Sequence, residues 1–192
     1  MSTLQEAVAA PPASDRMPRW KSITGASAAI LLSLLFFVSG IWKLTDLDAT
    51  AQRMIQSLVP VALSMPAAVA VAIFETFTAV LLLLPRHRRW GAWLAALMLI
   101  AFMIYIGVLY NRLLGEDCNC FPWVRRVVGP AFFAGDAAML GLAVLAAWWS
   151  VESRGWRRAA AILGCVCLAA CGSYGITALR RGAADAPETA VV

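Results

Sequence analysis

Five apolar segments, each about as long as a bilayer is thick, constrain this chain more than any other feature. A hydrocarbon core about 30 Å thick is crossed by about 20 residues of α-helix. Of the 192 residues, 61% are hydrophobic and 14% are charged, whereas a soluble domain has about 25% charged residues. The chain is therefore predicted to be an all-α, polytopic membrane helix bundle. The expected spans are residues 22–42, 61–84, 90–110, 131–150 and 159–179.

Tryptophan residues support the limits of four of these spans. The indole ring is most stable at the interface between membrane and water, and no tryptophan lies in the middle of an expected span. The limits therefore rest on two independent signals, hydropathy and aromatic placement. The tryptophans at the span ends are Trp20, Trp42, Trp90, Trp93, Trp148, Trp149 and Trp156.

Polar segments flank and divide the bundle. Residues 1–21 are polar and rich in proline and alanine, without the apolar stretch of a signal peptide, and are expected to form a loosely ordered tail. Residues 22–150 form the expected four-helix domain, 151–179 contain a fifth transmembrane helix, and 180–192 form a polar tail. Arginines lie in short clusters between apolar runs, which indicates contact with the lipid bilayer and no nucleic-acid partner.

Basic residues predict the orientation of the chain. The short hairpin "PRHRRW" (residues 85–90) carries three arginines, and short basic loops tend to stay in the cytoplasm. We therefore expect a multi-pass protein of the bacterial inner membrane, with a cytoplasmic N-terminus and with the connection 114–130 outside. His87, the only histidine, is expected to be a solvated neighbour of these arginines and no ligand.

A short amphipathic helix is predicted between the first two spans, over about residues 45–58. Its apolar residues recur with i, i+3, i+4 spacing. Thr45 or Asp46 can cap its start, and Pro60 prevents its continuation. The segment is too polar to span a membrane, so we expect it to lie along the outer surface as an ordered lid.

The acidic, turn-rich stretch "GEDCNCFPW" (residues 115–123) carries Cys118 and Cys120. Outside the cytoplasm, disulfides persist. A disulfide across a single intervening residue closes a small, strained ring, and strained, exposed disulfides tend to be labile or catalytic. Arg125 and Arg126 follow closely and could stabilise a thiolate. We therefore predict that the two cysteines form a redox-active pair.

Two other interpretations of this pair stay open, a static structural clip and half of a metal site. Zinc usually has four protein ligands, and no further cysteine or histidine lies nearby in the sequence, so no metal is assigned. Cys165, Cys167 and Cys171 lie inside the fifth span. There we expect buried thiols that behave as small hydrophobic side chains, with the first two unable to pair because i and i+2 face different sides of a helix.

Two carboxylates lie within expected spans. An ionised group at the bilayer centre costs at least about 2.5 kcal/mol, which makes such a residue a functional candidate by default. Glu75 is predicted to be a proton relay, or the polar end of a quinone or partner site, and Asp136 a second polar group. The structural alternative is a hydrogen bond across helices, to Ser39 or Thr78.

These residues resemble the MauE/DoxX membrane proteins over roughly residues 22–149. The sequence "GIWKL" (residues 40–44) before an amphipathic segment and a proline is similar to the end of that family's first span. Glu75 resembles its acidic residue in the second helix. "DCNCF" (residues 117–121) resembles the C-x-C-F of methylamine utilisation protein MauE, and "FFAGDAAMLGLA" (residues 132–143) its following helix.

The resemblance implies a four-helix membrane bundle with a role in the maturation of methylamine dehydrogenase, alongside a periplasmic thioredoxin-like partner that forms disulfides. In that setting Cys118 and Cys120 exchange thiol for disulfide with the partner, and electrons pass on to a membrane quinone. The alternative is a non-catalytic assembly factor or complex subunit in which the cysteines form a clip. A third hypothesis, metal handling, finds less support because the methionines lie mostly in mid-span.

The orientation can be tested with topology reporters. A reporter enzyme that works only in the cytoplasm should be active when it is fused at Arg88. One that works only outside the cytoplasm should be active when it is fused at Asn119, because the basic hairpin is the strongest retention signal. A cytoplasmic Asn119 would contradict the redox hypothesis, since the cysteines would then face a reducing pool.

Overall fold

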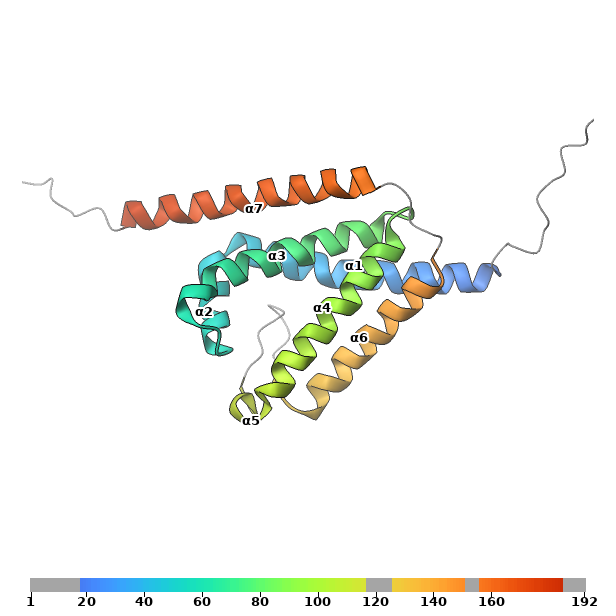
Figure 1. The fold of residues 1–192 in the computed structure, drawn as a ribbon, viewed down its shortest axis with the longest axis horizontal. Helices are drawn as coiled ribbons and strands as arrows, with labels where there is room; N and C mark the ends of the chain where they lie inside the picture. Colours follow the sequence, from blue (N-terminus) through green and yellow to red (C-terminus); the bar gives the residue numbers. More distant parts are fainter. Residues whose placement is uncertain (1–17, 117–125, 151–155, 185–192) are drawn as a thin grey trace, which may run out of the picture.

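The protein is a bundle of helices in all the parts that the structure, a computed structural model, describes: residues 18–116, 126–150 and 156–184. The regular elements in these residues are all helical (Figure 1), which confirms the predicted fold class. They are α1 (Arg19–Thr45), α2 (Leu47–Gln56), α3 (Val61–Leu83), α4 (Arg88–Val108), α5 (Tyr110–Leu113), α6 (Pro130–Trp148) and α7 (Trp156–Ala184).

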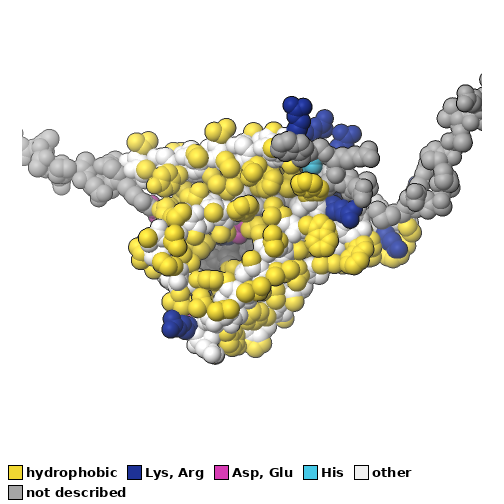
Figure 2. All heavy atoms as spheres, viewed as in Figure 1, with side chains coloured by type: hydrophobic (Ala, Val, Ile, Leu, Met, Phe, Trp, Pro, Cys, Tyr) yellow, Lys and Arg dark blue, Asp and Glu magenta, His cyan; other side chains and the backbone are white. Residues whose placement is uncertain are grey.

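Five of the described helices are long and apolar enough to cross a membrane, namely α1, α3, α4, α6 and α7. Their outer surface is apolar over most of the face seen in Figure 2. Large apolar side chains of these helices are exposed, among them Ile30, Leu34, Leu97 and Leu168. A surface of this kind is expected where side chains meet lipid tails, so the chain is a multi-pass membrane protein.

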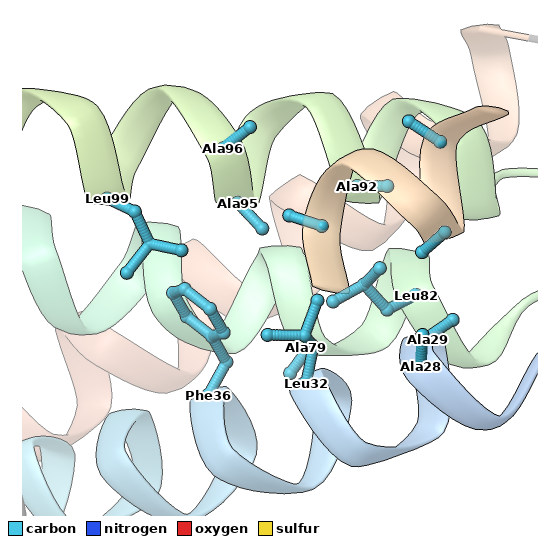
Figure 3. Packing of buried hydrophobic residues seen from close by; sticks show 13 residues of the cluster. Ala28, Ala29, Leu32, Phe36, Ala79, Leu82, Ala92, Ala95, Ala96 and Leu99 are labelled. Atoms are coloured by element: carbon cyan, nitrogen blue, oxygen red, sulfur yellow. The ribbon is translucent and has the colours of Figure 1, made fainter. Parts of the chain in front are cut away.

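The helices α1, α3, α4 and α6 share one apolar core, and α7 lies along the outside of α3 (Figure 1). Alanines fill much of the core, where Leu32, Phe36, Leu82 and Leu99 supply the larger side chains (Figure 3). Small residues let helices approach closely, and close packing is the main attraction between helices in a bilayer. The stability of the core therefore depends more on close contact between the helices than on large buried side chains.

The predicted amphipathic helix is present as α2. Its N-cap is Asp46, whose carboxylate accepts a hydrogen bond from the Ala49 amide at 3.0 Å. After its last residue the chain turns through Leu58 in the left-handed region, at φ 69°. The helix packs on α3, and the Tyr105 hydroxyl of α4 donates to the Ser57 carbonyl at 2.8 Å. Its expected position as a lid on the membrane surface stays a prediction.

Glycines set the closest approaches between spans. A Cβ added at Gly40 of α1 would lie 2.5 Å from Thr76 Oγ1 and 2.9 Å from the Thr76 amide nitrogen of α3. A Cβ at Gly91 of α4 would lie 2.8 Å from the Leu82 amide nitrogen of α3. Because neither position has room for even a methyl group, α1 and α4 are both held directly against the backbone of α3.

The Gly40 contact can be tested by adding that methyl group. Gly40→Ala should lower the free energy of unfolding by about 1–3 kcal/mol, because the α1 and α3 backbones must separate. Gly141→Ala is the matched control, since a Cβ at this helical glycine of α6 would meet nothing within 4 Å. Unfolding in detergent measures both, and equal stability of the two variants would contradict the close approach.

Candidate functional site

The polar centre of the bundle is an ion pair between α1 and α3. Lys43, in the last turn of α1, donates through Nζ to both carboxylate oxygens of Glu75, at 2.8 Å to Oε1 and 2.7 Å to Oε2. The two side chains retain only 8% and 13% of their exposure. The predicted intramembrane carboxylate is therefore compensated by a cation from a neighbouring span.

The ammonium of this pair is fully hydrogen-bonded. Its third bond, 2.5 Å long, goes to the hydroxyl of Ser39, which lies one helical turn before Lys43. A lysine ammonium has three donors, and all three are used here. The pair lies beside the close approach of Gly40 and Thr76, which holds α1 and α3 in register around it.

Sequence reasoning found Glu75 but missed its partner. Lys43 directly follows Trp42, where the expected first span ends, so the hydropathy pattern leaves it outside that span. The structure extends α1 to Thr45, which brings Lys43 inside the bundle. The spacing of four between Ser39 and Lys43 puts both on one face of a helix and was the usable signal. The suggested bond from Glu75 to Thr78 is not found, because the Thr78 hydroxyl donates to Met98 Sδ at 3.6 Å.

A second ion pair lies where the connection between α5 and α6 leads into α6. Nη2 of Arg126 donates to Asp136 Oδ1 at 2.6 Å and to the Phe132 carbonyl at 2.9 Å, both in α6. The guanidinium also lies 4.7 Å from the centroid of the Phe132 ring. Nη2 would lie 2.9 Å from a Cβ at Gly135, so a larger residue there would press on the guanidinium.

Asp136 uses only half of its hydrogen-bonding capacity. Its side chain is 1% exposed, and Oδ2 has no partner among the described residues. A buried acceptor without a donor is uncommon in native proteins. The two intramembrane carboxylates thus lie in different pairs on different helices, and no described contact joins Asp136 to Glu75.

The predicted redox pair, Cys118 and Cys120, lies outside the described residues, as does Arg125. The structure does describe the two ends of that connection. The Gly115 amide donates to the Val128 carbonyl at 3.1 Å, and the Val128 amide donates to the Glu116 carbonyl at 3.0 Å. These bonds, with the Arg126–Asp136 pair, anchor both ends of the segment that carries the cysteines. Since Nη2 of Arg126 is committed to Asp136 and Phe132, the expected role of this arginine beside a thiolate gains no support.

Two further expectations need correction. His87 is 4% exposed at the N-cap of α4, not solvated, because the α3–α4 hairpin closes tightly at Gly91. Cys165 and Cys171 are exposed on α7, not buried, because this helix meets the rest of the bundle along one side only. Cys165, Cys167 and Cys171 are free thiols. In the described ranges, no three His, Cys, Asp or Glu side chains lie close enough to hold a metal ion.

The chain is similar to one known protein family over most of its length. The model of the family described as methylamine utilisation protein MauE matches residues 21–150. No match was found among curated proteins or among solved structures. The matched range contains both ion pairs and the two cysteines of the connection, and it stops before α7. Because the match covers well over half of the chain, this membrane protein belongs to the MauE family, which is linked to methylamine utilisation.

Proposed function

We propose that the protein is a membrane thiol–disulfide carrier, in which Cys118 and Cys120 exchange with a periplasmic thioredoxin-like protein, as in methylamine dehydrogenase maturation. The observation that carries the proposal is the anchoring of the connection at both ends, by the Gly115–Val128 and Glu116–Val128 backbone bonds and by Arg126–Asp136. Cys118 follows Glu116 by two residues and Cys120 precedes Arg126 by six, so short stretches of chain join both thiols to residues that are fixed in the bundle.

A thiolate of the partner attacks the Cys118–Cys120 disulfide and forms a mixed disulfide, and a second partner thiolate then displaces it. The partner leaves as a disulfide, and the protein keeps two thiols. A membrane quinone bound in the bundle would take up the two electrons and two protons that are released when this dithiol returns to the disulfide.

The Lys43–Glu75 pair is the proposed site for the quinone head group. A quinone carbonyl accepts hydrogen bonds, and all three donors of the Lys43 ammonium are engaged, two with Glu75 and one with Ser39. Bonds between charged groups are roughly twice as strong as bonds between neutral ones. The bond to the neutral Ser39 hydroxyl is therefore the one that a quinone carbonyl would replace, with Glu75 holding the ammonium in position.

The full use of the three Lys43 donors also supports a second candidate function. An ammonium with three satisfied donors needs no ligand, which suits a static pair that fixes the register of α1 and α3. In that case the protein is a non-catalytic assembly factor or complex subunit, and Cys118 and Cys120 form a structural clip.

The two functions differ in the behaviour of the ion pair on mutation. Lys43→Met and Glu75→Leu should each lower the free energy of unfolding by about 3–5 kcal/mol, because each leaves one charge buried without its partner. The double variant removes both charges and should regain this stability. Quinone reduction by the reduced protein should be lost in all three variants. Thr78→Val, at a buried position of the same helix, is the control. Full quinone reduction by the double variant would exclude this site as the quinone site.

The thiol exchange has its own test. Cys118→Ser or Cys120→Ser leaves a single thiol, which can attack the disulfide of the oxidised partner in the reverse direction of the exchange. The mixed disulfide should then accumulate as a covalent adduct on a non-reducing gel, because the second thiol that would complete this reaction is gone. Cys171→Ser, at an exposed thiol of α7, is the matched control and should trap nothing. The midpoint potential of the pair should lie well above about −300 mV. A lower potential, with no adduct from either variant, would favour the assembly factor.

A further inference from the structure

A basic cluster lies where the α3–α4 hairpin meets the start of α7. Ala170 of α7 shares an apolar cluster with Ala72 of α3, and the two helices run in opposite directions (Figure 1). With the same rise per residue in both helices, this register puts Arg158 beside the end of α3 and close to Arg86. Figure 2 shows Lys and Arg side chains gathered on this corner of the molecule.

The cluster is not neutralised within the described residues. Arg86 in the hairpin and Arg157 and Arg158 in the first turn of α7 are all exposed. The first turns of α4 and α7 contain no acidic residue. Exposed guanidinium groups from two separate segments therefore face one region of the surface, and an anion there would meet several donors at once.

The N-terminus of α4 opens into the same region. The helix begins at Arg88, and no side chain caps its first amides. These amides have no partner inside the helix, and they give its N-terminus a partial positive charge that favours phosphate groups. The C-terminus of α3 lies next to it and carries a partial negative charge. There Nε of Arg88 donates a hydrogen bond to the Leu82 carbonyl at 3.2 Å, which offsets part of that charge.

A second, independent observation is the state of His87. This N-cap residue is 4% exposed, and no hydrogen bond to its imidazole occurs in the described part of the chain. Its ring nitrogens are not among the described side-chain atoms that are completely buried without a partner, so they keep some access to a partner from outside the chain. A phosphate oxygen at the N-terminus of α4 would supply one, at the place where the amides and the arginines also converge.

We propose that this corner binds the phosphate of an anionic phospholipid. Exposed Trp90 and Trp93, at 53% and 54%, flank the start of α4 and are typical of the depth at which head groups lie. Basic pockets between transmembrane helices bind lipid phosphates of this kind. Arg157 and Arg158 lie beyond the matched residues 21–150, so their contribution to the site is added to the family domain by α7.

The experiment uses the purified full-length protein in detergent micelles, where its orientation in a membrane plays no part. Phosphatidylglycerol, phosphatidylcholine or inorganic phosphate is titrated while the unfolding midpoint, Tm, is followed. Phosphatidylglycerol should raise Tm saturably, and the other two should not. Each arginine near anionic lipid contributes about fivefold in affinity, so Arg157→Gln with Arg158→Gln should weaken the apparent affinity roughly 25-fold.

Two controls separate a built site from general attraction. The double variant Arg53→Gln with Arg112→Gln removes the same charge from the other end of the bundle and should leave the affinity unchanged. His87→Ala should weaken binding without removing an arginine. Equal stabilisation by inorganic phosphate would assign the corner to a free anion, and equal losses in both double variants would reduce it to diffuse attraction. Either result, or no response to phosphatidylglycerol, overturns the proposal.

Discussion

The contact between α1 and α3 supports the rest of the bundle. Lipid tails are as apolar as leucine, so helices in a bilayer are held together by close packing and polar contacts. Both are concentrated here: Gly40 lies against the Thr76 backbone, and Lys43 binds Glu75 immediately beside it. In its turn α3 contacts α2, α4 and α7. A change in the register of α1 against α3 would therefore reach the other helices too, including α6, which packs on α1 and α4.

Electrostatics and packing reinforce each other at this contact. A lysine and a glutamate that are taken out of water lose hydration, and only good geometry with further hydrogen bonds offsets the loss. The glycine at position 40 provides that geometry, because it lets the backbones approach until Nζ of Lys43 reaches both oxygens of Glu75 and the Ser39 hydroxyl. A bulkier residue would separate the helices and lengthen the ionic bonds, so the pair and the glycine form one structural unit.

The spans were predictable from the sequence because the bilayer fixes their length, and α2 was predictable because its apolar stripe and its cap are local. Partners across helices were not. Lys43 and Glu75 are 32 residues apart, and their pairing depends on the relative register of two helices, which hydropathy does not encode. Hydropathy also fails to separate lipid-facing from bundle-facing positions, since both are apolar. For that reason Cys165 and Cys171 were expected inside and lie outside.

The two ion pairs differ in a way that bears on their roles. Both oxygens of Glu75 are engaged with Lys43, whereas Asp136 keeps Oδ2 buried and without a described partner. A saturated pair resists change, and a half-satisfied carboxylate can still accept a proton or a donor. Asp136 lies in the second turn of α6, joined through Arg126 to the end of the connection that carries Cys118 and Cys120. Under the proposed function, oxidation of those thiols releases two protons, and Asp136 is a carboxylate with a spare acceptor that is joined to one end of the connection. The proposed function would thus give Glu75 the task of holding the ammonium of Lys43 in place, and the Arg126–Asp136 pair the task of taking up a proton near the thiols.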